Sequence, residues 1–300
     1  MNSVAILLST YNGEDYLNDQ LNSLKHQKKV KITIYVIDDS SKDNTINILE
    51  NSNLDIKILR RKGSRNPSKN FIDLIRLVPL NYDYYSFCDQ DDYWLKSKLS
   101  YSIFKIKLHK AEIVGSRSFI GNEKLKIFDI SRKFYNLSFN NSVVQSIAGG
   151  NTLLWTNKYQ RFLNGFHHSI VASHDWYLYQ MSYLYDYKFY FILKPTIIYR
   201  QHQNNVIGSN LGIKNLIKRI FLGISGQYQH WHNLNENHLI HDIDQKKINE
   251  INLEKAQYFY YFRKKNAFLR VFKIFFEFKF RRQLLMENIL LFIALLIKKV

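Results

Sequence analysis

The sequence predicts an α/β fold built around a mostly parallel sheet, and the prediction depends on the alternation of strand-like and helical segments. Short apolar, β-branched or aromatic runs of strand length alternate with segments of helical spacing up to about residue 112. Alternation of this kind is typical of parallel strands joined by right-handed crossovers. In such sheets ligands bind beyond the carboxyl ends of the strands, so chemistry is expected in the loops after the strands.

The predicted elements follow one another in a regular order. Strands are predicted at 4–8, 32–37, 56–59 and 84–88. The helices between them are indicated by apolar residues at helical spacing, namely Leu17, Leu21 and Leu24, then Ile46 and Leu49, then Phe71, Leu74, Ile75 and Val78. The same sheet is expected to be completed by a helix over 174–185 and by strand-like runs at 112–115, 151–155, 188–193 and 196–200.

The amino-acid composition limits the cellular compartments and the classes of partner that can be expected for this protein. The single cysteine, Cys88, excludes an intrachain disulfide and a cysteine-rich zinc site, which favours a reducing cytosol. The amino terminus has a very short apolar run and no basic leader, so no cleavable signal is expected. A formal net charge of +18 calls for an anionic partner, and the candidates are nucleic acid, acidic phospholipid or a negatively charged small substrate.

Against this positive charge, acidic residues concentrate directly after three predicted strands. The segments are STYNGEDYL (9–17), DDSSKDNT (38–45) and DQDD (89–92). A doubly wound sheet brings such strand ends together, where carboxylates repel one another unless a cation or a ligand lies among them. Oxygen ligands of this kind select Mg²⁺ or Mn²⁺ over zinc, so a divalent cation is expected there.

The order and spacing of five segments carry a resemblance to a known family. STYNGEDYL, VIDDSSKDNT, CDQDDYW, SHDW and YRQHQNN occur in this order between about residues 3 and 208. Together they resemble the family 2 glycosyltransferases of GT-A fold, and most of all the rhamnosyltransferase-like enzymes of bacterial surface polysaccharide assembly. The resemblance implies a hexosyltransferase that uses a nucleoside-diphosphate sugar. Beyond Gly208 the sequence changes to basic, aromatic, helical segments, so a boundary is expected at about Asn210, between a GT-A domain over 1–210 and a basic amphipathic helical extension over 211–300.

The resemblance assigns roles to individual residues. It implies that Tyr11 stacks near the base and that Asp39 accepts the N3 hydrogen of uracil or thymine. Asp175, which follows His174, takes the position of the general base. The residues implied to bind the nucleotide sugar are Ser9, Tyr11, Asp39, Lys69, Asp89 and Arg200. The implied ligands of Mn²⁺ or Mg²⁺ are Asp91 and His202, and the implied acceptor contacts are Asn151 and Trp176.

The chemistry of transfer supports these assignments. Displacing a nucleoside diphosphate builds negative charge that a metal ion and cationic side chains stabilise. One carboxylate opposite the leaving group can take the proton of the incoming hydroxyl, and a single attack inverts the anomeric carbon. A glycosidase needs two opposed carboxylates, and the clustering here favours a diphosphate site instead. The Gln-x-x-Arg-Trp signature of processive members is absent, which favours addition of a single sugar.

Some of the acidic residues have a plain structural interpretation. Asp92 is expected to cap the helix that begins near Lys96, because Asp is common at such turns. Asp38 and Asp43 are likewise expected to cap the helix that contains Ile46 and Leu49.

The end of the chain is basic and apolar. Residues 261–300 contain ten Lys and Arg against two Glu, a net charge of +8, interleaved with aromatic and aliphatic residues. The final apolar run is too short to span a bilayer, which takes about 20 residues. The extension is therefore interpreted as interfacial, on the anionic cytoplasmic face of the membrane, and the alternative is packing on the first domain or on a second subunit as a homo-oligomer.

Three classes of function follow from the sequence. The first is an inverting, metal-dependent transferase that moves rhamnose from dTDP-rhamnose to a lipid-linked saccharide in capsule, O-antigen or cell-wall polysaccharide assembly. Within that class, hexosyl or N-acetylhexosaminyl transfer from a UDP-sugar is the alternative. The second class is a single-strand nucleic-acid binder, which acidic clusters at successive strand ends disfavour. The third is a membrane scaffold with a degenerate transferase fold, which intact Asp39, Asp91 and Asp175 disfavour.

Overall fold

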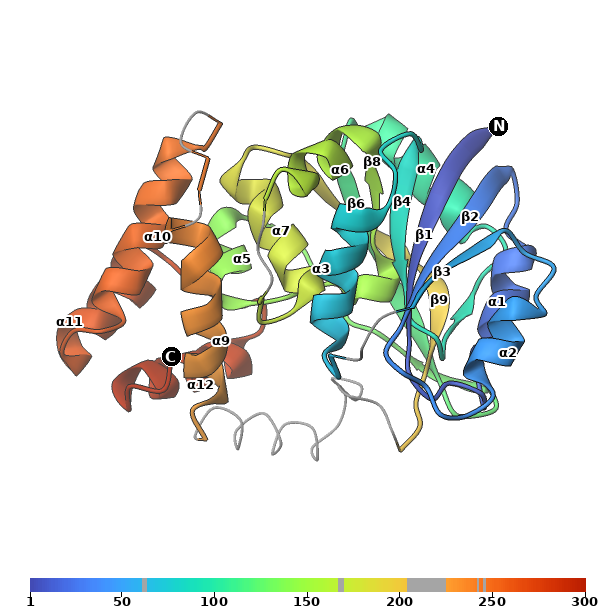
Figure 1. Cartoon of the computed structure of the whole chain (residues 1–300). Coiled ribbons are helices and arrows are strands. Elements are labelled where there is room, and N and C mark those ends of the chain that lie inside the picture. The colour runs from blue at the N-terminus through green and yellow to red at the C-terminus, as the bar shows by residue number, and fades with distance from the viewer. Residues whose placement is uncertain (61–63, 167–169, 204–224, 242, 245–246) are drawn as a thin grey trace. The chain divides into compact units, whose positions relative to one another are not determined.

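The computed structural model describes residues 1–60, 64–166, 170–203, 225–241, 243–244 and 247–300 (Figure 1). The chain divides into two compact units. Unit 1 comprises Met1–Lys133, Ala148–Ser169 and Lys188–Ser209, and unit 2 comprises Phe134–Ile147, Ile170–Tyr187 and Asn210–Val300. Unit 2 therefore takes in two segments that precede the boundary proposed from the sequence. That boundary, residue 210, lies outside the described residues.

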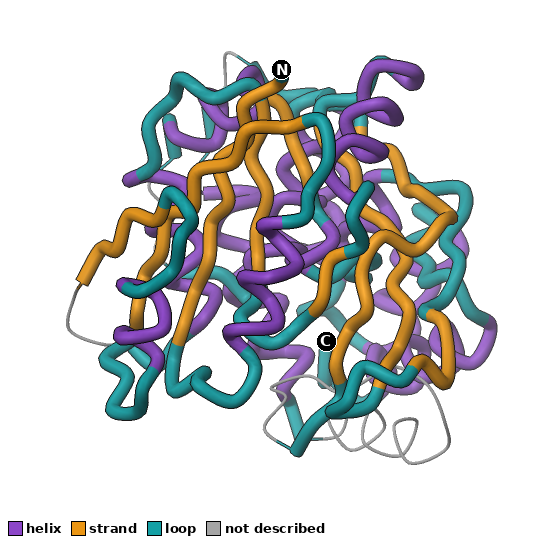
Figure 2. The backbone as a smooth tube through the Cα atoms, turned by 90° about the vertical axis from the view of Figure 1, so that its right-hand side faces the viewer, coloured by secondary structure: helices purple, strands orange, loops and turns teal. Residues whose placement is uncertain are grey.

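Unit 1 contains one mixed sheet, whose strands Figure 2 shows in orange. The strands β1 (Asn2–Thr10), β2 (Val30–Asp38), β3 (Ile56–Arg60) and β4 (Tyr84–Cys88) are parallel neighbours in the order β3-β2-β1-β4. The four strands predicted for the first part of the chain are thus confirmed. Their carboxyl ends meet at one edge of the sheet, which is where the acidic segments begin.

The remainder of the sheet is mixed in direction. Beyond β4 the order continues with β8 (Leu154–Thr156), β6 (Ile113–Gly121), β9 (Phe189–Arg200) and β5 (Tyr93–Trp94), while β7 (Ile127–Ile130) pairs with β6. The strand β8 is antiparallel to both of its neighbours, and β9 is parallel to β6 and antiparallel to β5.

One prediction about this half of the sheet is wrong. The runs 188–193 and 196–200 form a single strand, β9, which passes through Pro195. Its pairing with β6 shifts register between Ser116 and Ser118, opposite that proline. Proline has no N–H to donate to a ladder, so the strand continues through it only where pairing is interrupted by an irregularity of this kind.

The helices of unit 1 follow the apolar spacing of the sequence. They are α1 (Leu17–Lys25), α2 (Thr45–Glu50), α3 (Pro67–Leu77), α4 (Lys98–His109) and α6 (Asn157–Asn164), with a short 3-10 turn, η1, at Gly150–Thr152. The first three confirm the predicted helices. Pro67 occupies the first turn of α3 behind the capping residue Asn66, a position where proline costs no hydrogen bond.

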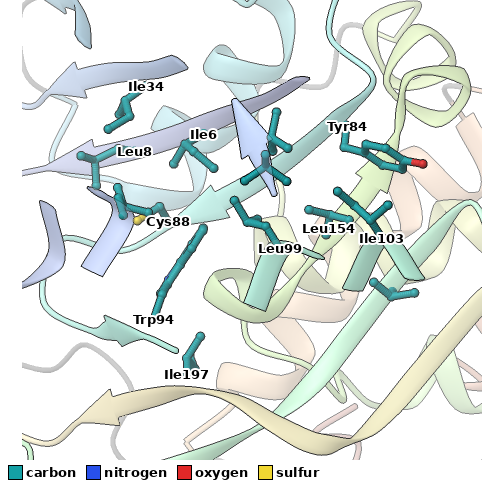
Figure 3. Close-up of a cluster of buried hydrophobic side chains, with 14 of the residues drawn as sticks. Ile6, Leu8, Ile34, Tyr84, Cys88, Trp94, Leu99, Ile103, Leu154 and Ile197 are labelled. Atoms are coloured by element: carbon teal, nitrogen blue, oxygen red, sulfur yellow. The ribbon is translucent and has the colours of Figure 1, made fainter. Parts of the chain in front are cut away.

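The core of unit 1 explains why its strands read as continuous apolar runs. Ile6, Leu8 and Ile34 from the parallel strands pack with Trp94 and Leu99 in a cluster whose labelled members are fully or almost fully buried (Figure 3). All five residues of β1 from Val4 to Leu8 have no exposed surface. Parallel strands covered on both faces require this pattern, since neither face meets water.

Unit 2 is helical throughout its described residues. Its elements are α5 (Phe139–Val144), α7 (His174–Leu184), α9 (Gln227–Glu236), η2 (Asn237–His241), α10 (Glu250–Phe262), α11 (Ala267–Val271), η3 (Phe272–Glu277) and α12 (Leu285–Leu296). Helix α7 confirms the prediction for 174–185, and the helices after residue 225 confirm the helical character expected there. Within the described ranges, none of these helices is long and apolar enough to cross a membrane.

Candidate active site

The loops after β1, β2 and β4 are tied together by hydrogen bonds, as the sequence predicts. The main-chain N–H of Asp39 donates to the carbonyl of Thr10 across 2.8 Å. Gln90 holds the other side, because its Oε1 accepts from the N–H of Tyr11 at 2.8 Å and its Nε2 donates to the carbonyl of Tyr11 at 3.0 Å. The amide of Gln90 therefore fixes the β1 loop against the β4 loop.

Two predicted nucleotide-binding residues, Ser9 and Asp39, are joined through the loop after β3. The N–H of Ser64 donates to Oδ1 of Asp39, and the hydroxyl of Ser64 lies 3.0 Å from Oδ1 of Asn70. Nδ2 of Asn70 in turn donates to the hydroxyl of Ser9 at 3.0 Å. Asp39 is 3% exposed, so its carboxylate is oriented by this chain of bonds. Ser64 and Asn70 were missed by sequence reasoning, because nothing local marks a loop serine and a helix asparagine as neighbours of Asp39.

The other predicted nucleotide residues of unit 1 lie around the same loops. The ring of Tyr11 is 43% exposed, which leaves a face free to stack on a base. Lys69 lies in the first turn of α3, where its Nζ pairs with Oδ2 of Asp73 at 2.9 Å. Asp89 is half-buried directly after β4.

The two residues predicted to hold a metal are in contact. Nε2 of His202 lies 2.9 Å from Oδ2 of Asp91, and both side chains are largely buried. The ring of Tyr16 lies against the imidazole with the two centroids 4.7 Å apart. Tyr16, the N-cap residue of α1, thus lies against a predicted metal ligand, although no local sequence signal distinguishes it.

Arg200 holds the loop that carries Asp91. Its Nε donates to the main-chain carbonyl of Asp91 at 2.8 Å, and its Nη2 pairs with Oδ2 of Asp19 at 2.7 Å. Its Nη1 donates to the carbonyl of Glu123 at 2.5 Å, and the guanidinium lies 4.6 Å from the ring centroid of Tyr16. Arg200 is 3% exposed, so its buried guanidinium links the segments that contain Asp91, Asp19 and Glu123 within unit 1.

The interpretation of Asp92 as a helix cap is wrong. The N-cap position of α4 is Ser97, and Asp92 has no exposed surface. Its carboxylate accepts from Nδ2 of Asn151 and, at 3.1 Å, from the N–H of Arg200. Burial, together with the neighbouring Asp91 and Asp89, raises the pKa of Asp92 well above its ordinary value. Asn151, predicted to contact the acceptor, therefore has its amide directed at Asp92.

A buried lysine lies next to this loop. Lys98 has 1% of its surface exposed, donates from Nζ to the hydroxyl of Ser86 at 3.0 Å, and has that Nζ 3.3 Å from the ring centroid of Trp94. Burial lowers the pKa of Lys98 to about 7. Burial also raises the pKa of the Cys88 thiol, so this lone cysteine is not a reactive thiolate.

The two other predicted caps have different outcomes. Asp38 does not cap α2, because both its oxygens bond within the turn after β2, to the N–H and hydroxyl of Ser41 at 2.9 and 2.6 Å and to Thr10 at 2.9 Å. Asp43 is not the N-cap of α2, which is Asn44, but it lies directly before that residue, and its Oδ1 accepts from the N–H of Thr45, the first residue of α2, at 3.1 Å.

The predicted base lies in unit 2. Asp175 occupies the first turn of α7, where Oδ1 accepts from the N–H of Trp176 at 2.8 Å and from the hydroxyl of Ser173. The hydroxyl of Ser146 reaches Oδ2 at 3.2 Å. These bonds orient a half-buried carboxylate that forms no ion pair with any residue that the structure describes, which suits a proton acceptor. The ring nitrogens of the adjacent His174 are buried, and their burial lowers the pKa of His174 to about 4, so it is neutral near pH 7.

Trp176 is more enclosed than a sugar-stacking residue usually is. Its Nε1 donates to the carbonyl of Ser142 at 2.6 Å, and the residue is 8% exposed. The edge of its indole meets the ring of His232 at a centroid distance of 5.7 Å. Its acceptor role stays a prediction.

The residues around Asp91 fit a divalent cation held mainly by its substrate. In the part of the chain that the structure describes, no group of three or more His, Cys, Asp and Glu side chains is arranged to hold a metal ion. Mg²⁺ is usually bound by one or two carboxylates together with substrate phosphates and water. Asp91 supplies one carboxylate and His202 supplies one imidazole nitrogen, so these two residues fit a cation that takes its other ligands from substrate phosphates and water.

A mixed sheet whose parallel strands end in linked acidic loops defines the class of a GT-A glycosyltransferase. The model of glycosyl transferase family 2 matches residues 5–187, and the chain belongs to that family. It is therefore a glycosyltransferase enzyme, and neither the nucleic-acid-binding nor the scaffold alternative is needed. The chain is 32% identical over 229 residues to the dTDP-rhamnosyl transferase RfbG of Shigella flexneri, an alignment that covers 72% of this chain and 78% of that protein.

Solved structures share the fold at low sequence identity. TarS residues 1–349 of Staphylococcus aureus, in complex with UDP-GlcNAc, superimpose with a TM-score of 0.55 at 16% identity, covering 90% of this chain and 83% of that one. The mannosyltransferase PcManGT of Pyrobaculum calidifontis, in complex with GDP-Man and Mn²⁺, gives a TM-score of 0.53 at 12% identity, covering 99% and 85%. Both likenesses concern the fold, and they confirm the GT-A prediction.

Proposed function

We propose that this enzyme transfers rhamnose from dTDP-rhamnose to a saccharide acceptor with inversion at the anomeric carbon. The observation that carries the proposal is the 32% identity to a dTDP-rhamnosyl transferase over most of both chains. Hexosyl or N-acetylhexosaminyl transfer from a UDP-sugar is the second candidate, supported by the shared fold of TarS with UDP-GlcNAc. Uracil and thymine both present an N3 hydrogen, so Asp39 serves either donor.

The nucleotide is proposed to lie over the ends of β1 and β2. The buried carboxylate of Asp39, held by the N–H of Ser64, accepts the N3 hydrogen of the base. The exposed ring of Tyr11 stacks on that base, while Ser9 lines the floor beneath it. Lys69 contributes positive charge at the start of α3, and Asp89 faces the ribose.

The diphosphate is proposed to lie at Asp91 and His202, which would together hold Mn²⁺ or Mg²⁺. Such a cation, when bound, neutralises the charge that develops on the leaving diphosphate. Arg200 adds positive charge beside this position and keeps Asp91 in place through its main-chain carbonyl. Direct contact between Arg200 and a phosphate requires the guanidinium to exchange its bond with Asp19, which is itself half exposed.

Asp175 is proposed to take the proton of the attacking acceptor hydroxyl. Ser146 and Ser173 hold the carboxylate, so one oxygen can turn to the substrate while the other stays bonded. One base and one displacement invert the anomeric centre. Trp176 and Asn151, both buried, would contribute to the acceptor site as walls and not as free hydrogen-bonding groups.

The acceptor is proposed to be a lipid-linked saccharide of a capsule, O-antigen or cell-wall polysaccharide, which places the enzyme on the cytoplasmic face of the membrane. The excess of Lys and Arg in residues 261–300 supports this location.

The proposal is tested with purified protein, Mn²⁺ or Mg²⁺, and a panel of thymidine- and uridine-linked sugars. We expect dTDP release to be fastest with dTDP-rhamnose, and the product linkage to be of opposite anomeric configuration to the donor by NMR. Asp175→Asn should abolish transfer while donor binding persists, whereas Asp129→Asn, an exposed acid on β7, should behave as wild type. A faster reaction with a UDP-sugar would assign the second candidate, and no turnover of any donor would refute both.

A further inference from the structure

Helices α11 and η3 of unit 2 present three phenylalanines to solvent. Phe268, Phe272 and Phe276 are 80%, 50% and 54% exposed and follow one another at intervals of four residues. Their rings lie side by side, with centroids 6.3 Å apart for the first pair and 6.5 Å for the second. The four-residue interval places them on one face of the helical segment, so they form a continuous aromatic ridge.

Helix α12 carries a second apolar ridge. Its exposed apolar residues recur at helical spacing and are between 41% and 78% exposed, namely Leu285, Met286, Ile289, Ile293 and Leu296. The only charged residue of α12, Glu287, is 4% exposed and accepts from Nε2 of Gln145 at 2.9 Å. The outward face of α12 therefore has no charge, although water solvates an exposed helix best through charged side chains.

The helices that carry the two ridges contact one another within unit 2. Nη1 of Arg270, in α11, donates to the carbonyl of Leu295 in α12, and the rings of Phe275 and Phe292 meet edge to face at 5.9 Å. Arg270 is 1% exposed, so this contact is internal to unit 2. Contiguous exposed apolar surface marks a site of interaction.

Exposed positive charge follows each ridge in the sequence. Arg263 and Arg270 are buried, which removes them from the basic surface expected from the sequence. Lys279, Arg281 and Lys298 are exposed and lie between or after the two ridges. A second copy of this chain would bring these like charges together, whereas an anionic lipid surface is complementary to them.

We propose that these two ridges, together with Lys279, Arg281 and Lys298, dock unit 2 on an anionic lipid leaflet. The phenylalanine ridge and the α12 ridge enter the boundary between headgroups and acyl chains, and the three cations contact the phosphates. The inference deepens the membrane location given under the proposed function and is independent of the transfer chemistry, because it rests on exposure, spacing and charge alone.

The test uses full-length protein and vesicles of phosphatidylcholine with and without phosphatidylglycerol, read by co-sedimentation. We expect wild type to prefer anionic vesicles, and Phe268→Ser with Phe272→Ser to weaken partitioning at least about tenfold. Lys279→Glu with Arg281→Glu and Lys298→Glu should remove the preference for phosphatidylglycerol. The matched control is Phe104→Ser with Leu108→Ser on α4 of unit 1, where the two residues are 54% and 55% exposed, and it should partition as wild type.

The outcomes separate this inference from the proposed function. Unchanged partitioning of the phenylalanine variant would overturn the docking surface, and so would a wild-type dimer that the same substitutions convert to a monomer. Donor hydrolysis in solution should be equal for wild type and variants, since the substitutions lie outside the candidate active site. An enzyme that turns over no donor but still binds anionic vesicles through these residues would refute the proposed function and keep the docking surface.

Discussion

The two units bury charge in different ways. At the strand ends of unit 1 the buried carboxylates of Asp38, Asp39 and Asp92 are bonded to loop N–H groups, hydroxyls and amides. In unit 2 the buried guanidiniums of Arg263 and Arg270 donate to main-chain carbonyls near the ends of helices. The first arrangement orients carboxyl groups at the predicted donor site, and the second supplies donors to main-chain carbonyls. We therefore expect substitutions at the strand ends of unit 1 to affect activity, and substitutions of the buried arginines of unit 2 to affect folding stability.

The largest effect that would sharpen this comparison is expected at Asp91. Asp91→Asn should lower kcat/KM about a thousandfold, or about 4 kcal/mol, because the carboxylate next to His202 loses its charge. The unfolding temperature should stay near that of wild type, since the amide keeps an oxygen for the imidazole. Release of nucleoside diphosphate and a thermal melt measure the two quantities. A large fall in the unfolding temperature would make Asp91 structural and break the comparison.

Replacing a buried arginine of unit 2 should lower the stability of the fold and leave donor binding unchanged. Arg270→Met keeps the apolar stem but leaves the carbonyls of Leu295 and Lys265 without their donor, at a cost of about 3 kcal/mol in the free energy of unfolding. Donor binding, measured by calorimetry, should be retained. The control Arg281→Met, at an exposed position, should change the urea midpoint very little. Equal destabilisation by both substitutions would contradict the structural role of Arg270.

A smaller loss of folding stability is expected when the pH is lowered, because of the buried His232. Burial, together with Arg263 and Arg282, lowers the pKa of His232 to about 3. The unfolded chain binds a proton from about pH 6.5 downward while the folded state does not, so stability present above pH 6.5 is lost progressively as the pH falls. At pH 5 the loss is about 2 kcal/mol, at roughly 1.4 kcal/mol for each pH unit.

The measurement is the urea midpoint between pH 7 and 5. His232→Phe, placed among the rings of Trp176, Phe259 and Tyr260, should flatten its pH dependence. His26→Phe, at an exposed position, should leave the dependence as in wild type. An unchanged slope in His232→Phe would assign the acid sensitivity to other groups.

The smallest effect is expected at Lys69. Its ion pair with Asp73 is partly exposed, so Lys69→Ala should change the free energy of unfolding by less than about 0.5 kcal/mol. If Lys69 meets the nucleotide, the KM for the donor should rise about threefold, which corresponds to about 0.7 kcal/mol. Lys158→Ala removes a comparable pair with Glu112 and serves as the control in steady-state kinetics. An equal KM for both variants would remove Lys69 from the donor site.

The sequence predicted those parts of the fold that depend on local pattern. Strands β1 to β4 and helices α1 to α3 follow from apolar runs and helical spacing, and the acidic loops follow from their place after the strands, whereas the short strand β5 was not predicted. The family resemblance implies that Asp91 and His202 are ligands of one metal ion, and their side chains are in contact in the structure.

The errors concern residues whose partners are distant in sequence. Asp92 looks like a cap because α4 follows it, yet its partners Asn151 and Arg200 come 59 and 108 residues later. Segments 134–147 and 170–187 join unit 2 because α5 and α7 pack together, as the bond from Trp176 to Ser142 illustrates. Local propensity has no access to such pairings, which only the folded chain creates.

The bonds of Arg200 have a consequence for engineering donor specificity. Exchanging residues 89–92 for the corresponding loop of a relative would bring in new side chains, but it would also remove the carboxylate of Asp92, which accepts from the N–H of Arg200 in β9 and from the amide of Asn151 in η1. Arg200 is in turn held by Asp19 of α1. Arg200, Asn151 and Asp19 therefore form a minimal transplant together with the loop. Chimaeras that carry all four parts should express as folded enzymes, while single-loop swaps should accumulate as insoluble protein.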